Sequence, residues 1–136
     1  MFLIVILIMV LVSCGSSKLT IINAWARAGT AGGNSAIYLI MDNPTDQDDV
    51  LLSVYSNVAE AVELHRSQMT DEGTMTMQQQ ENIPLPSGTK IELKPGGLHI
   101  MLVNLKHDLI AGDSFQVTFT FQNAGEINLK VLIQAP

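Results

Sequence analysis

Cysteine is almost absent from this chain of 136 residues: Cys14 is the only one, so no intramolecular disulfide can form. Basic residues are also few. The seven Lys and Arg are scattered without a run or stripe, and the net charge is -6. A phosphate backbone would be repelled by such a chain, so nucleic acid is excluded as a partner. The length fits one domain.

Motifs typical of common enzyme classes are missing too. The sequence has no nucleophile elbow, no paired-carboxylate motif and no phosphate loop, so we expect no enzymatic activity. Acidic residues cluster once, at Asp42, Asp46, Asp48 and Asp49. This segment lacks the spacing of an EF-hand and its closing Glu, so a solvated loop is the simpler interpretation.

A long apolar run is lacking as well, because the run that opens the chain, MFLIVILIMVLV, ends after twelve residues. A membrane-spanning helix needs about 20 apolar residues, whereas this length is typical of the apolar part of a signal peptide. The tetrapeptide Leu-Val-Ser-Cys that ends at Cys14 resembles the lipobox of bacterial lipoproteins. In that class the cysteine is acylated and becomes the new N-terminus.

This resemblance implies three parts. Residues 1–13 are expected to be a lipoprotein signal peptide, residues 14–18 a lipidated Cys14 with a short tether, and residues 19–136 the folded domain. The domain would then lie outside the cytoplasm, in the periplasm or at the outer cell surface, anchored to the membrane by its lipid. A plain signal peptide with an incidental cysteine is the alternative.

Short segments with strand character follow, separated by joints rich in Gly, Pro, Asn and Asp. The last two segments alternate apolar and polar residues with period two, as half-buried strands do. The expected strands are 19–28, 35–41, 50–56, 60–66, 74–80, 89–93, 98–105, 114–121 and 126–133. A helical turn at 57–64 is the one alternative. Many short strands at near-regular spacing predict an all-β antiparallel sandwich or barrel.

Histidine and methionine are placed so that their side chains can converge. His99 and Met101 occupy positions i and i+2 of an expected strand and therefore share a face. Met75 and Met77 have the same relation on another segment, and His65 ends a third. Thioethers are soft ligands that select copper(I), and imidazole also suits copper. Zinc prefers thiolate, imidazole or carboxylate over thioether, and a blue-copper centre would need a cysteine thiolate.

Methionine is also a common filler of protein cores, so core packing is the alternative interpretation of these residues. We expect Met41, which follows an apolar strand, to lie in the core. His107 lies in the polar tripeptide Lys-His-Asp and is expected to be exposed. Met69 and Met75 fit either the core or a spare thioether near a metal site.

The spacing resembles that of the PCuAC family of periplasmic copper chaperones. That family's pattern is His, an optional Met, ten residues, Met, twenty-one residues and His-x-Met. Here His65, position 66, ten further residues, Met77, twenty-one residues and His99-Ile100-Met101 match it. The short segments AWAR, SAIY, VELH and LKPGGLHIML are also similar to the corresponding segments of the family. The resemblance covers roughly residues 19 to 133.

The resemblance implies a cupredoxin-like Greek-key β-sandwich that binds one copper(I) through His65, Met77, His99 and Met101. It implies a monomeric carrier that delivers copper toward the CuA centre of cytochrome oxidase, alone or with a Sco-like thioredoxin-fold partner. Arg66 stands where the optional methionine would be, which is a departure from the pattern. The alternatives are a copper storage protein without a specific acceptor and a non-metal Ig-like lipoprotein binding module.

Overall fold

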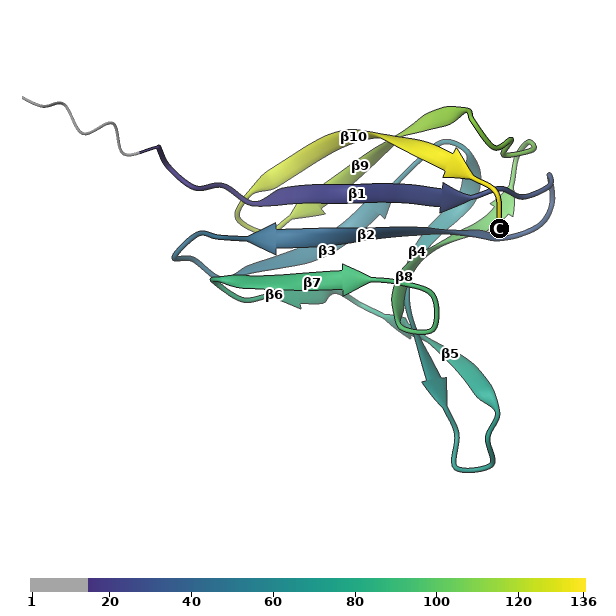
Figure 1. Ribbon diagram of the computed structural model, residues 1–136, viewed down its shortest axis with the longest axis horizontal. Coiled ribbons are helices and arrows are strands. Elements are labelled where there is room, and N and C mark those ends of the chain that lie inside the picture. The colour runs from purple at the N-terminus through teal and green to yellow at the C-terminus, as the bar shows by residue number, and fades with distance from the viewer. Residues whose placement is uncertain (1–14) are drawn as a thin grey trace, which may run out of the picture.

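The computed structural model describes residues 15–136, and every regular element in it is a strand (Figure 1). The strands are β1 (Thr20–Arg27), β2 (Ser35–Asn43), β3 (Asp49–Tyr55), β4 (Ala59–Met69), β5 (Met75–Gln80), β6 (Ile83–Leu85), β7 (Thr89–Leu93), β8 (Leu98–Leu105), β9 (Ser114–Phe121) and β10 (Gly125–Gln134). No helix among these residues is long and apolar enough to cross a membrane. The expected signal peptide and the lipidated Cys14 lie outside the described residues.

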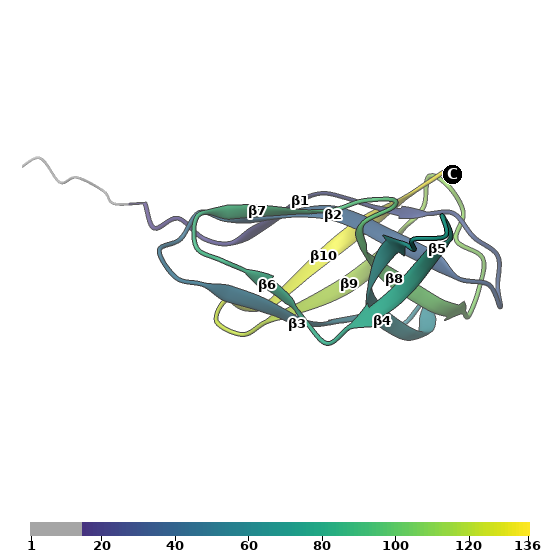
Figure 2. The same ribbon diagram turned by 90° about the horizontal axis from the view of Figure 1, so that it is seen from below.

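The strands form a sandwich whose hydrogen-bonded order is β5-β4-β8-β2-β1-β10-β9-β3-β6, with β7 also paired to β2. Figure 2 shows β1, β2 and β7 along one side and β3 and β6 along the other, with β10 and β9 linking them. The pairs are antiparallel except that of the first and last strands, β1 and β10, which run parallel. The predicted all-β sandwich is confirmed.

The core is built by the alternation seen in the sequence. Val117, Phe119 and Phe121 of β9 are buried, and Val131 and Ile133 of the neighbouring β10 are buried with them. These side chains lie on the inner faces because alternate residues of a strand point to opposite sides. Met41 is fully buried in the same core, as predicted.

Two segments differ from expectation. The helical alternative for residues 57–64 is wrong, because residues 57–58 form a turn and β4 begins at Ala59, from which it pairs with β8, Ala59 lying opposite Leu105. Strand β6 was not predicted, because Pro84 marks a joint in the sequence. Its neighbours Ile83 and Leu85 are buried, and the strand stands last in the order, where a proline is tolerated because no ladder bond is lost.

The acidic cluster is more than a solvated loop. Asp49 is only 6% exposed. Its carboxylate accepts the backbone N–H groups of Val50 at 2.8 Å, Asn123 at 2.9 Å and Ala124 at 2.9 Å. The solvated interpretation is therefore wrong for this residue, which fastens the start of β3 to the turn between β9 and β10. Asp46 is exposed, as expected.

Replacing Asp49 by Ala should lower the free energy of unfolding by about 2 kcal/mol, because partly buried N–H groups lose a charged acceptor. Urea unfolding monitored by circular dichroism measures this change. Asp46→Ala is the matched control and should change stability by less than about 0.5 kcal/mol. Equal effects of the two substitutions would contradict the fastening role of Asp49.

Candidate metal centre

The two histidines of the predicted site meet across a strand pair. His65 on β4 lies directly opposite His99 on β8, and their ring centroids are 5.8 Å apart. Residues directly opposite in an antiparallel pair project to the same face. His99 is only 4% exposed, and the ring of the buried Tyr38 lies on its other side, with centroids 6.5 Å apart. The pairing register thus brings together two imidazoles that are far apart in sequence.

A tight turn sets the position of His99. The N–H of Gly97 donates to the carbonyl of Lys94 at 3.0 Å, and Gly96 has a φ of 82°. Proline at the second position and glycine with positive φ at the third are typical of a type II turn, which Pro95 and Gly96 supply. The carbonyl of Gly97 then accepts the Nδ1–H of His99 at 3.0 Å. The Pro-Gly-Gly turn therefore orients the imidazole as well as starting β8.

Hydrogen bonds also decide which ring nitrogens are free. A carbonyl can only accept, so His99 carries its proton on Nδ1 and leaves Nε2 as a lone pair. The carboxylate of Glu63 lies 2.7 Å from Nε2 of His65 and accepts from it in the same way. Nδ1 of His65 is buried and has no hydrogen-bond partner among the described residues. Each imidazole thus has one nitrogen outside these hydrogen bonds that could bind a metal ion.

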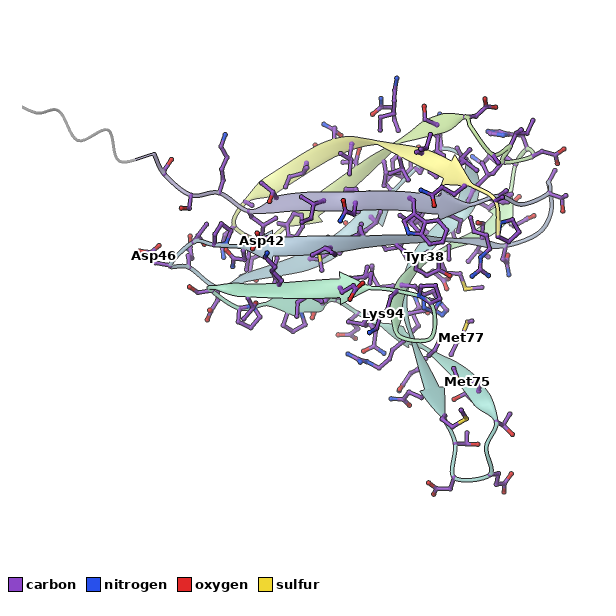
Figure 3. All side chains as sticks on the ribbon, viewed as in Figure 1. Tyr38, Asp42, Asp46, Met75, Met77 and Lys94 are labelled. Atoms are coloured by element: carbon purple, nitrogen blue, oxygen red, sulfur yellow. The ribbon has the colours of Figure 1, made fainter. Side chains whose placement is uncertain are left out.

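Methionine sulfur lines a cavity beside the histidines. Met101 lies two residues beyond His99 on the same face of β8, and Met77 on β5 lies opposite Ser67 on β4. The cavity has a volume of about 330 Å³. Its walls include Met75, Met77, His99 and Met101. Figure 3 shows Met75 and Met77 on the β4–β5 hairpin, which extends away from the sandwich.

The structure therefore gathers the four residues predicted as ligands around one place. Met77, His99 and Met101 line the cavity, and His65 packs against the ring of His99. Met77 stands apart from the other three because it is 60% exposed on the hairpin. Among residues 15–136, no three His, Cys, Asp or Glu side chains gather as a metal site. The donors present here are imidazole and thioether, the set suited to a soft ion.

The remaining sequence candidates fall outside this arrangement or beside it. His107 is exposed in the loop after β8, as predicted. Met69 is 66% exposed, so it is not a core residue, and Met75 lines the cavity. Arg66 is exposed, and as the neighbour of His65 in a strand it points to the opposite face, away from the cavity.

Glu63 is the residue that sequence reasoning missed. It lies two positions before His65 on the same strand, so the two side chains share a face. That spacing was visible in the sequence, but it carries meaning only once β4 is known to be a strand, and the helical alternative left this open. Arg27 and Tyr38 also line the cavity, and the guanidinium donates to the phenolic oxygen at 3.1 Å.

Substituting Glu63 by Ala should allow His65 to adopt both of its tautomers. A hydrogen bond to a charged group contributes about 1.5–3 kcal/mol, which is enough to fix one tautomer. Imidazole nitrogen NMR of the metal-free protein should show His65 protonated at Nε2, with a lone pair at Nδ1, and a mixture in the variant. Glu60→Ala, on an exposed position of the same strand, should leave the signals unchanged. A proton on Nδ1 in the unsubstituted protein would contradict the assignment.

Solved structures with the same fold include PCuAC domains. The copper-bound PCuAC domain from PmoF2 superposes with a TM-score of 0.74 at 26% identity, over 89% of this chain and 96% of that domain. The apo PCuAC domain from PmoF1 gives a TM-score of 0.75 at 28% identity, over 89% and 97%. The copper(I) form of DR1885 from Deinococcus radiodurans, at 21% identity, agrees in fold with a TM-score of 0.63, over 89% and 83%.

Relatives in sequence come from two bacteria. Protein RP573 of Rickettsia prowazekii (strain Madrid E) is 35% identical over 106 residues, which are 76% of this chain and 58% of that protein. "Putative lipoprotein Lxx21020" of Leifsonia xyli subsp. xyli (strain CTCB07) is 33% identical over 101 residues, which are 74% and 60%. The matched part thus spans less than two thirds of either relative.

The chain also matches the model of one protein family. The family described as "Putative lipoprotein LpqE-like" matches residues 19–133, which include every strand except the last residue of β10. The matched range also contains all four predicted ligands. The chain therefore belongs to the LpqE-like lipoprotein family and has the cupredoxin-like β-sandwich of PCuAC domains, which confirms the resemblance found in its sequence.

Proposed function

We propose that this protein is an extracytoplasmic copper(I) carrier that binds one ion through His65, Met77, His99 and Met101 and hands it to another protein without chemical turnover. The observation that carries the proposal is the buried, unpartnered Nδ1 of His65 beside His99 and a cavity lined by thioethers. A solved neighbour at 26% identity, the PCuAC domain from PmoF2, is copper-bound, which supports the choice of metal.

The donor set suits a cargo that must be released. Two imidazoles and two thioethers are neutral, so they satisfy a soft monovalent ion without the strong bond that a thiolate would form. Nδ1 of His65 and Nε2 of His99 are the nitrogens left free by the hydrogen bonds to Glu63 and to the carbonyl of Gly97. These outer contacts orient the rings before the ion arrives, which reduces the ordering cost of binding.

The four ligands differ in how firmly the fold holds them. His99 is buried and fixed by the turn that precedes it, whereas Met77 is 60% exposed on the hairpin. Met77 is therefore the ligand that can leave first. An acceptor protein would approach from the hairpin side. A metal-binding side chain of the acceptor would replace the sulfur of Met77 before the bonds from copper to the imidazoles break.

The proposed carrier acts at a membrane and delivers its copper to an acceptor there. Membership in a lipoprotein family supports an anchor at Cys14, which would hold the domain at the membrane, in the periplasm or at the outer cell surface. The resemblance to PCuAC proteins supports delivery toward the CuA centre of cytochrome oxidase, directly or through a Sco-like thioredoxin-fold protein. We expect one copper per monomer, because residues 15–136 bring one pair of histidines, His65 and His99, together beside the cavity.

A copper(I) competition titration under anaerobic reductant tests the site. The protein should bind one equivalent, and His99→Ala or Met101→Leu should weaken binding by about a hundredfold or more, equal to about 2.7 kcal/mol. His107→Ala is the histidine control, because that residue is exposed in a loop. Met41→Leu is the methionine control, because it keeps volume in the buried core. Both controls should bind as the unsubstituted protein does.

Binding that is indifferent to His99 and Met101, or no binding at all, would contradict the proposal. The methionines would then be packing residues, and the domain would be a β-sandwich binding module that uses no metal. Circular dichroism of each variant checks that a lost affinity comes from a lost ligand and not from a lost fold.

A further inference from the structure

Three methionines on the β4–β5 hairpin are exposed, although methionine side chains are usually buried. Met69, Met75 and Met77 are 66%, 51% and 60% exposed. None of the three belongs to the buried core or to the partly buried residues packed against it within residues 15–136. The other residues of β5 are Thr and Gln, so the strand is otherwise polar. Core packing therefore does not account for these thioethers.

The pairing register puts the three sulfurs on one face. Met69 lies directly opposite Met75, and Met77 follows two residues later, opposite Ser67. Directly opposite residues and residues at i and i+2 share a face. Ser67, Met75 and Met77 line the cavity, so this face is the one turned toward it.

On this face the three methionines form a row that runs from the tip of the hairpin toward the histidines. The hairpin projects from the sandwich, and its turn is the part farthest from the body (Figures 1 and 3). Met69 and Met75 form the pair next to the turn, and Met77 lies between that pair and the histidines. The turn itself is pinned by the N–H of Thr70, which donates to the carbonyl of Thr74 at 2.8 Å.

Charge at the hairpin favours a cation. Asp71 and Glu72 stand exposed in the turn, two and three residues beyond Met69. The basic residue of the hairpin, Arg66, points to the opposite face from the methionines. Carboxylates at the tip raise the local concentration of positive ions, and thioethers among them select soft ions.

We propose that Met69, Met75 and Met77 form a thioether-only entry site for copper(I), from which the ion passes to His65 and His99. The inference rests on the proposed function, because it needs the histidine site as its destination. Transfer is ligand exchange: bonds from copper to the sulfurs of Met69 and Met75 break as bonds to the two imidazole nitrogens and to the sulfur of Met101 form. Copper remains copper(I), and Met77 stays bound throughout. Since Met77 belongs to both sites, the protein holds one ion at a time.

The variant His65→Ala/His99→Ala isolates the entry site. With methionine methyl groups labelled with ¹³C, titration by copper(I) under anaerobic reductant should shift the signals of Met69, Met75 and Met77. The signal of the fully buried Met41 should not move. Adding Met69→Leu and Met75→Leu to this variant should abolish the remaining binding. Absence of shifts at Met69 and Met75 would overturn the entry site.

A kinetic comparison tests the path in the protein with both histidines intact. Met69→Leu/Met75→Leu should leave the equilibrium affinity within about twofold but slow copper(I) uptake from a chromophoric chelator by about fivefold or more, because rate and affinity are separate quantities. Met41→Leu should change neither. Unchanged uptake would overturn the entry path and leave the histidine site standing. Methyl shifts in a protein whose affinity ignores His99→Ala would instead overturn the proposed function.

Discussion

The pairing of β4 with β8 is the constraint on which the rest of the centre depends. It puts His65 opposite His99, and the same register puts Glu63 opposite Met101. A slip of one residue would turn these side chains to the other face and remove the centre altogether. The register is held from both sides, because β8 also pairs with the buried β2 and begins at a tight turn with a positive φ at Gly96. The rigid sandwich thereby fixes the histidines.

The centre is rigid on one side and open on the other. His99 is buried and oriented by a backbone carbonyl, and His65 is oriented by a carboxylate. The thioether of Met77 instead comes from a hairpin that projects into solvent. In the proposed carrier this asymmetry would separate two requirements, since the fixed imidazoles would provide affinity and the exposed sulfur would provide exchange. Neutral ligands would hold a copper ion without making its release prohibitive.

Sequence patterns within single strands and turns predicted much of the fold correctly. The alternation in β9 and β10 predicted two strands and their buried faces, and one of the expected joints rich in Gly and Pro is the turn that precedes His99. Local rules failed where long-range contacts decide. Asp49 is buried because backbone N–H groups of Asn123 and Ala124, more than seventy residues away, come to its carboxylate. Strand β6 forms despite Pro84 because it pairs with β3 at the end of the strand order and buries Ile83 and Leu85.

The sequence by itself determined that the chain is all-β and which soft donors stand at family spacing. These follow from side-chain chemistry and from periods within single strands. Only the tertiary structure decided that Glu63 holds Nε2 of His65, that Nδ1 is left buried and free, and that Met69 stands against Met75. Each of these depends on which strands pair and in which register, and that is fixed by packing of the whole sandwich.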